Sequence, residues 1–331
     1  MSRYHVYGVG NALVDLEFEI PDAMLGELEV DKGLMTLIEE DRHHQLLDSL
    51  SHIEARPCGG GSAANTITAC AQLGGKAYYS CKVADDKTGH FFLQDLTGNG
   101  VETNLDANSL AAGITGKCIV LVTPDAERSM NTFLGITAKI GVPELDEDAI
   151  RESDIVYIEG YLVPEANARA AAVKAREIAK AADVQTALTL SDVNMVKFFK
   201  DGLLEIAGDG LNLVFSNQDE AMLMFEADNI QGCIDGMKSI SEKFAITRGA
   251  QGAVLFDGQN VIEISADMVE PIDSNGAGDI YAGAFMYGLT HGMPFGQCGE
   301  LAGHAAATLI TRFGARLTRE ELLAVGKRFT A

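Results

Sequence analysis

The chain has 331 residues, 47% of them apolar, which is enough to bury the core of one large α/β domain or of two smaller ones. Its formal net charge of −23 repels phosphate backbones and anionic lipids, so nucleic acids and membranes are poor candidate partners. No apolar run is long enough to span a membrane. The six cysteines have no C-x-x-C spacing, so we expect neither a metal cluster nor disulfides, and a reducing cytosol is the natural compartment.

The first predicted strand, residues 4–10, ends in glycine and leads directly into Asn11 and Asp15. One interpretation of these two polar residues is turn chemistry, in which Asn caps and Asp is solvated. The other is a binding site for a vicinal diol, because a carboxylate can accept two hydroxyl protons. Both interpretations stay open on these residues alone.

Short alternating segments, residues 16–20 and 33–37, predict strands that cannot easily join a parallel core. A helix is expected over residues 39–50, with His43 and His44 on its polar side. A surface position is a better explanation of these two histidines than a metal site, because no third ligand is in view.

A glycine-rich turn at residues 59–62 precedes a predicted helix of small residues, 63–73. Glycine lets a ligand approach the backbone, Ser62 can cap the helix, and Asn65 faces back toward the turn. The alternative is close packing of this helix on the sheet. Together with Asp15, we expect Gly60, Gly61 and Asn65 to line the hydroxyl-rich part of a substrate.

The next segments, residues 115–122 and 128–134, predict a hairpin around a turn at 124–126. Apolar strands then alternate with helices, which predicts a parallel sheet covered on both faces. The strands are expected at 155–158, 186–190 and 211–215, and the helices at 164–182 and 193–206.

Asn217 and Glu220 follow the last of these strands, at the edge where α/β folds bind ligands. Their spacing also fits a capping box at an ordinary helix start. A further turn follows the predicted strand 244–247, and its glycines, Gly249 and Gly252, let a ligand approach the backbone. A hairpin is then expected between residues 254–256 and 261–264.

The stretch 273–279, with the sequence D-S-N-G-A-G-D, precedes an apolar segment that predicts a helix. Gly276, Ala277 and Gly278 permit a sharp turn that exposes N–H groups at a helix N-terminus, which suits an anion. The Asp279 carboxylate would repel such an anion, so it is not expected to bind it. We interpret Asp279 instead as a base that removes the proton from a hydroxyl group attacking a phosphate. The alternative is that Asp279 is only favoured by the helix dipole.

This heptad resembles the C-terminal signature of the ribokinase-like (PfkB) carbohydrate kinases, and C-G-G-G-S-A-A-N at residues 58–65 resembles their N-terminal signature. The resemblance covers essentially the whole chain, 1–331. It implies a single three-layer α/β/α domain with a mostly parallel sheet. It also implies a small β-sheet lid, contributed by about residues 14–38 and about 113–134.

The resemblance implies an ATP-dependent phosphotransferase that uses Mg²⁺, with a monovalent cation such as K⁺ as a possible activator. Asp279 would be the base, and the amides of Gly276, Ala277 and Gly278 would stabilise the transferred phosphoryl group. Glu220 would organise magnesium through water. The implied substrate residues are Asn11, Asp15, Gly60, Gly61, Asn65, Leu134 and Tyr161. The implied nucleotide residues are Asn217, Glu220, Thr247, Gly249, Gly252, Asn275 and His304.

Within this family, Asn11, Asp15, Asn275 and the segments around Thr115 and Arg128 are similar to adenosine kinases. This resemblance therefore implies transfer to the 5′-hydroxyl of adenosine, giving AMP. One alternative is a kinase for ribose, fructose or a related ketose. A less favoured alternative is a non-catalytic nucleoside-binding regulator. The sequence leaves open whether the chain is a monomer or a homodimer paired through its lid.

Overall fold

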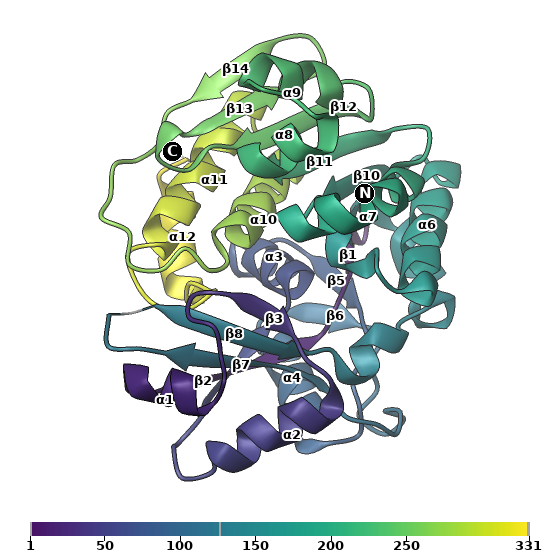
Figure 1. Cartoon of the computed structure of the whole chain (residues 1–331). Coiled ribbons are helices and arrows are strands. Elements are labelled where there is room, and N and C mark those ends of the chain that lie inside the picture. Colours follow the sequence, from purple (N-terminus) through teal and green to yellow (C-terminus); the bar gives the residue numbers. More distant parts are fainter. Residues whose placement is uncertain (1, 126, 330–331) are drawn as a thin grey trace.

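A nine-stranded sheet forms the centre of the molecule in the computed structural model, which describes residues 2–125 and 127–329 (Figure 1). The strand order is β14-β13-β12-β11-β10-β9-β1-β5-β6. All paired strands are parallel except at β13, which is antiparallel to both of its neighbours. The bounds are β1 Tyr4–Val9, β5 Ala77–Ser80, β6 Val101–Thr103, β9 Ser153–Glu159, β10 Gln185–Thr189, β11 Leu211–Asn217, β12 Ser241–Thr247, β13 Ala253–Phe256 and β14 Val261–Ile264.

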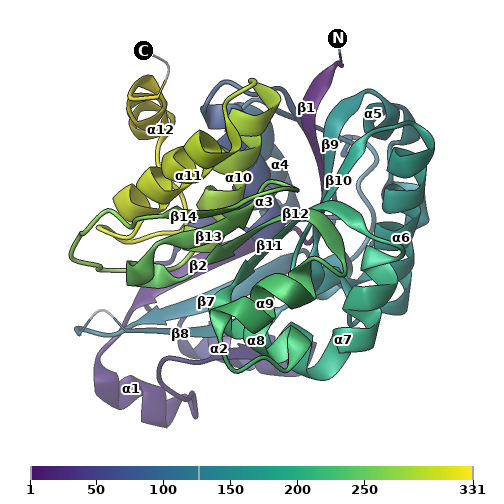
Figure 2. The same ribbon diagram turned by 90° about the horizontal axis from the view of Figure 1, so that it is seen from above.

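Helices cover both faces of this sheet, so that the sheet lies between two helical layers (Figure 2). One face carries α3 Ser62–Gln72, α4 Lys87–Gly98, α10 Ala277–Thr290, α11 Phe295–Leu309 and α12 Arg319–Lys327. The other carries α5 Glu147–Arg151, α6 Ala166–Ala181, α7 Val193–Ala207, α8 Gln218–Phe225 and α9 Ile230–Met237. Alternate residues of β9 serve the two cores, since Ile155 and Tyr157 pack in the first and Val156 and Ile158 in the second. Because helices bury both faces of the sheet, the side chains on both sides of its central strands are apolar.

Helices α3 and α10 approach each other closely through small residues. An ideal Cβ on Gly283 of α10 would lie only 2.4 Å from the carbonyl oxygen of Thr66 of α3. Any side chain at this position would push the two helices apart. This contact matters for function because α3 and α10 begin at the two glycine-rich turns, so their packing sets the distance between those turns.

A second, five-stranded sheet lies across the carboxyl-end side of the first, at the bottom of Figure 1. Its strand order is β3-β8-β7-β2-β4, and one of its faces is covered by two helices. The bounds are β2 Leu13–Glu19, α1 Asp22–Glu27, β3 Met35–Leu37, α2 Glu40–Ser49, β4 Arg56–Gly60, β7 Gly116–Val122 and β8 Arg128–Phe133. The predicted hairpin corresponds to β7 and β8, although its turn residue Ala126 lies outside the described residues.

The second sheet differs from the sequence prediction in three places. Strands were expected at residues 16–20 and 33–37, but the chain between them forms a helix, α1, whose Leu25 is buried against the sheet. Strand β4 was not predicted, because its short sequence R-P-C-G-G has no apolar alternation. His43 was expected on the polar side of α2, yet it is 1% exposed and its ring stacks on Phe133 at 4.9 Å.

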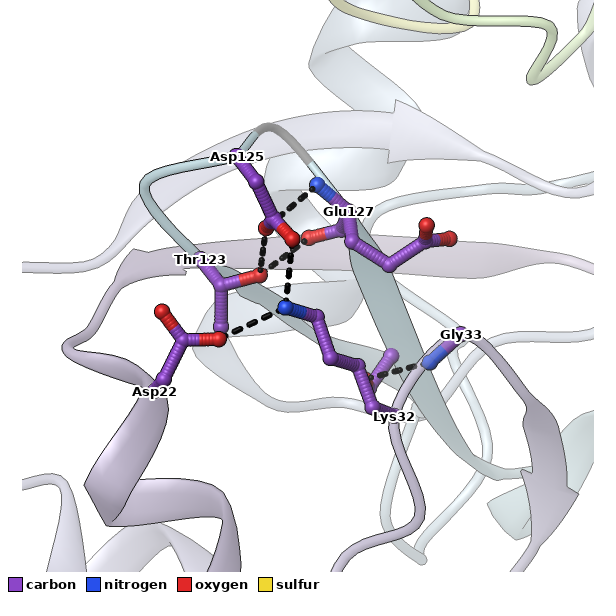
Figure 3. A network of polar contacts seen from close by, with 7 residues as sticks. Asp22, Lys32, Gly33, Thr123, Asp125 and Glu127 are labelled. Atoms are coloured by element: carbon purple, nitrogen blue, oxygen red, sulfur yellow. Dashed lines mark hydrogen bonds and ion pairs between the residues drawn. The ribbon is translucent and has the colours of Figure 1, made fainter.

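Polar contacts hold the excursion between β2 and β3 against the β7–β8 hairpin (Figure 3). The ammonium group of Lys32 donates to Asp22 and to Asp125, at 2.6 Å in each case. Asp125 also accepts a hydrogen bond from Thr123, and hydrogen bonds from Lys32 and Thr123 lower the pKa of Asp125 to about 2. The backbone N–H of Gly33 donates to Ser129. These contacts fix the approach to β3, whose side chains reach the cavity described below.

Within the described residues, no helix combines the length and the apolar character needed to cross a membrane. All six cysteines lie in this part of the chain, and each is a free thiol.

Candidate active site

A cavity of about 600 Å³ lies between the carboxyl ends of the large sheet and the second sheet. Its location follows from the topology, because parallel strands leave a crevice at their carboxyl ends. The predicted site residues that line it are Asn11, Asp15, Gly61, Asn65, Leu134, Tyr161, Asn217, Glu220, Thr247, Gly249, Asn275, Gly276, Ala277, Gly278 and Asp279.

Three predicted site residues do not line this cavity. An ideal Cβ on Gly60 would lie 2.3 Å from the carboxylate of Asp15, so Gly60 makes room for that side chain. Gly252 has a φ of +80° in the turn between β12 and β13. His304 of α11 contacts the carboxylate of Asp267 and the guanidinium of Arg328. The nucleotide contacts assigned to Gly252 and His304 stay predictions.

Asp279 lies in the first turn of α10, three residues after the left-handed N-cap residue Gly276. The Ser62 hydroxyl donates to Oδ1 at 2.6 Å, and the Asn65 amide donates to Oδ2 at 2.9 Å. Burial raises the pKa of Asp279 to about 6, and these two hydrogen bonds oppose the rise. A carboxyl group with this pKa is ionised near neutral pH and can accept a proton.

Ser62 therefore has a different role from the one expected. The sequence suggested that it caps α3, but the N-cap residue is Gly61 and no side chain caps this helix end. The Ser62 hydroxyl is instead directed to Asp279 on another helix. Two glycine-rich turns that are far apart in the sequence thus meet at one carboxylate.

The backbone around Gly276 is shaped by close contacts. Its φ is +74°, and an ideal Cβ would lie 2.4 Å from the carbonyl oxygen of Ala315, so this position requires glycine. The first N–H groups of a helix have no carbonyl partner one turn back and can bind an anion. The N–H of Ala277 already donates to Ser274 at 3.2 Å.

A buried ion pair joins the second sheet to the heptad 273–279. Arg128 of β8 contacts Asp273 at 3.2 Å and Glu17 at 2.9 Å. Asp273 also accepts hydrogen bonds from the N–H groups of Asn275 and Gly314. The Asp273 carboxylate therefore organises the turn that leads into α10, and its ion pair with Arg128 connects this turn to β8 of the second sheet.

Glu159, at the end of β9, is a cavity residue that the sequence analysis missed. It is 1% exposed, and its carboxylate accepts hydrogen bonds from the Asn11 amide at 2.9 Å and the Ala63 N–H at 2.8 Å. Burial raises the pKa of Glu159 to about 7, against the effect of these hydrogen bonds. Its place at the carboxyl end of a buried strand is the signal that could have found it.

Asn217 and Glu220 form the capping box of α8 and also line the cavity. The Asn217 side chain accepts from the Glu220 N–H at 2.8 Å, and Glu220 accepts from the Asn217 N–H at 3.0 Å. Burial raises the pKa of Glu220 to about 7. The two interpretations of this motif are therefore compatible, since a capping residue can also face a ligand.

The charge of the cavity restricts what it can bind. Among the described residues that line it there is no Lys, Arg or His, whereas six are acidic, namely Asp15, Glu159, Glu165, Asp192, Glu220 and Asp279. Within the same part of the chain, no three His, Cys, Asp or Glu side chains are arranged to hold a metal ion by themselves. The oxygen atoms of Glu220 and Asn217 suit a hydrated Mg²⁺ that phosphates also bind.

A protein-family model described as "pfkB family carbohydrate kinase" matches residues 38–322. Two solved structures, an adenosine kinase from Sinorhizobium meliloti and a probable sugar kinase from Rhizobium etli, each superpose with a TM-score of 0.89. Their sequence identities are 33% and 32%, and in both cases 99% of each chain is covered. Adenosine kinase from Dictyostelium discoideum is 25% identical, over 97% of this chain and 98% of its own.

These similarities confirm the family resemblance and the α/β fold with a second small sheet that the sequence predicts. They also confirm that the protein is a kinase, for which ATP is the expected phosphoryl donor. This chain belongs to the PfkB family of carbohydrate kinases.

Proposed function

We propose that the protein transfers the γ-phosphoryl group of ATP to the 5′-hydroxyl of adenosine, giving AMP. The observation that carries the choice of a nucleoside is the apolar wall that the second sheet presents to the cavity. This wall includes Leu13, Met35, Leu37, Met130 and Leu134. A flat base can lie against such a wall, whereas a free sugar would bury its hydroxyl groups there without partners.

The polar end of the cavity suits the ribose. Asn11 and Asp15 lie where the first strand leads into the second sheet, and Asn65 lies beside Asp279. Asp15 accepts the 2′- and 3′-hydroxyl protons, which leaves the 5′-hydroxyl directed toward Asp279. Asp279 removes the proton from this hydroxyl as it attacks the phosphorus atom. The amides at residues 276–278 stabilise the negative charge that develops on the transferred group.

The nucleotide occupies the side of the cavity formed by Asn217, Glu220, Thr247, Gly249 and Asn275. Because no cationic side chain lines the cavity in the described structure, the phosphates depend on backbone N–H groups and a metal ion. Mg²⁺ neutralises phosphate charge and orients the leaving group when it is bound. Glu220 is the residue that would hold the hydration shell of this ion. A monovalent cation as activator and a cytosolic location remain predictions from the sequence.

A screen of ATP consumption tests this function. We expect turnover with adenosine, weak turnover with 2′- or 3′-deoxyadenosine, none with 5′-deoxyadenosine and none with ribose or fructose. Turnover of a free sugar but not of adenosine would establish the sugar-kinase alternative instead. Adenosine binding without any ATP consumption would indicate the non-catalytic regulator.

The Asp279→Asn variant is the control for this screen. It keeps the size of the side chain and can still bond to Ser62, but it cannot accept the proton. We expect turnover to fall by about a hundredfold or more while ATP still binds. Near-normal turnover in a folded Asp279→Asn protein would show that Asp279 is not the base.

A further inference from the structure

Arg316 lies in the segment between α11 and α12, and it reaches the site residues without lining the cavity. Its side chain is 15% exposed. The Nε–H donates to Oδ1 of Asn65 at 2.7 Å, and Nη1 donates to Asp95 of α4 at 2.6 Å. An ideal Cβ on Gly59 would lie 2.7 Å from Nη1, so the guanidinium is packed tightly against the strand that leads into α3.

The contact with Arg316 decides which way the Asn65 amide points. A guanidinium can only donate hydrogen bonds, so the atom of Asn65 that faces it must be the carbonyl oxygen. The NH₂ group is thereby directed to the other side, where it donates to Oδ2 of Asp279 at 2.9 Å. Without Arg316 only the bond to Asp279 would hold this orientation, and the oxygen of Asn65 would lose the donor that fixes the other end of the amide.

Arg316 also supplies positive charge in an acidic region. Its guanidinium is the cation that acts on Asp279, and it is the strongest of the influences that oppose the raised pKa of Asp15. The other groups that act on or face Asp279 are Ser62, Asn65, Asp15, Glu159, Tyr157 and Tyr161. None of these others carries a positive charge.

We infer that Arg316 is a positioning residue of the phosphoryl transfer, and that it acts through Asn65 to hold the carboxylate of Asp279 oriented and ionised. This inference rests on the proposed role of Asp279 as the base. It does not depend on which hydroxyl compound is the acceptor.

Arg316→Met tests the inference, with Arg312→Met as the matched control. Arg312 lies in the same segment, forms an ion pair with Glu321 and donates to the backbone carbonyl of Arg316 at 3.4 Å. Its replacement therefore removes an ion pair and a contact to the segment but leaves the bonds of the Arg316 side chain to Asn65 and Asp95 in place. We expect Arg316→Met to lower kcat by about tenfold or more, with little change in KM for ATP, because the base is misplaced but the nucleotide site is intact. The acid limb of its kcat–pH profile moves to higher pH. Arg312→Met leaves kcat and the profile unchanged.

A purely structural role predicts a different result. Arg316→Met would then lower the melting temperature and the fraction of active enzyme, while the pH profile and kcat per active site stayed as in the wild type, and this outcome overturns the inference. If Arg316→Met does not fold, Arg316→Lys replaces it. Lysine keeps the charge but cannot donate to Asn65 and Asp95 with a fixed fork, so kcat should still fall. A wild-type kcat in Arg316→Lys also overturns the inference.

The double variant Arg316→Met/Asn65→Ala tests whether Arg316 acts on Asp279 through Asn65. If Arg316 acts through Asn65, the double variant is no slower than the slower single variant, whereas independent roles would multiply. Asp279→Asn separates the two proposals. Loss of turnover in Asp279→Asn with normal kinetics in Arg316→Met refutes only the role of Arg316, and normal turnover in Asp279→Asn refutes the base itself.

Discussion

Asp15 lies on the cavity face of β2, between Cys58 of β4 and Cys118 of β7. Its carboxylate is buried, which raises its pKa to about 7, and the largest opposing effect is the charge of Arg316. Hydroxyl donors would stabilise the ionised form of such a group. Binding of a sugar diol at this position would therefore satisfy both the Asp15 carboxylate and the two hydroxyl groups. Without each other, these groups would be buried without hydrogen-bond partners.

Asp15→Ala should weaken adenosine binding and spare ATP binding. A hydrogen bond to a charged group contributes about 1.5–3 kcal/mol, so we expect the Kd for adenosine to rise by about tenfold or more. Glu19→Ala is the control, because it removes an exposed acidic side chain from the same strand but outside the cavity. Equal calorimetric affinities of the wild type and Asp15→Ala for adenosine would rule out the diol contact.

At the level of single residues, local sequence predicted the chemistry of the turns but not the contacts between them. Asp279, Asn65 and Gly61 were predicted to be site residues, and all three line one cavity. Arg316 was not predicted, because its partners Asn65 and Asp95 are far away in the sequence. Glu159 was missed although its place at the end of a buried strand is a local signal. Ser62 was assigned a local cap, and only the packing of α3 against α10 directs its hydroxyl to Asp279.

Among the helices, α8 and α12 carry the same local motif in different surroundings. Both begin with a capping box, formed by Asn217 and Glu220 in α8 and by Thr318 and Glu321 in α12. Glu220 lines the cavity and Glu321 does not. The pair therefore allows the capping role to be separated from the proposed role in binding magnesium.

Glu220→Gln should raise the magnesium concentration needed for half-maximal activity, with a smaller effect on KM for the acceptor. Glu321→Gln should leave the magnesium titration unchanged, and in both variants the glutamine carbonyl oxygen can still accept the N-cap N–H, so capping is retained. Initial rates over a range of Mg²⁺ concentrations measure this difference. Coincident titration curves for Glu220→Gln and the wild type would assign this motif to capping alone.

The long elements of the large sheet follow from periodicity, whereas the short elements of the second sheet do not. Strands β9, β10 and β11 are continuous apolar runs between amphipathic helices, so hydrophobic pattern alone predicts them. Strand β4 depends on its pairing with β2, and α1 depends on the burial of Leu25. Such short elements are stabilised by tertiary contacts rather than by local propensity.

The whole molecule has a formal net charge of −23, and the cavity is likewise lined by acidic side chains and by no basic ones among the described residues. Burial raises the pKa of Asp15, Glu159, Glu220 and Asp279, so folding holds each of these groups in an environment that favours the protonated form. The site is thus strained by its own charge until cations and hydrogen-bond donors arrive with the substrates. This arrangement makes stability and ligand binding depend on pH in the same region of the molecule.

The free energy of unfolding should therefore fall as pH rises from about 4.5 to 7. A carboxyl group whose pKa is higher in the folded than in the unfolded state binds more protons when folded. Its stabilising contribution is present below its unfolded pKa, 4.5 for Glu159, and is lost as pH rises through the folded value of about 7. Glu159→Gln should make this pH dependence shallower. Glu263→Gln removes the same charge from an exposed site on β14 and should leave the slope unchanged. Urea unfolding at several pH values in this interval, without ligands, measures both slopes, and equal slopes in Glu159→Gln and the wild type would contradict the prediction.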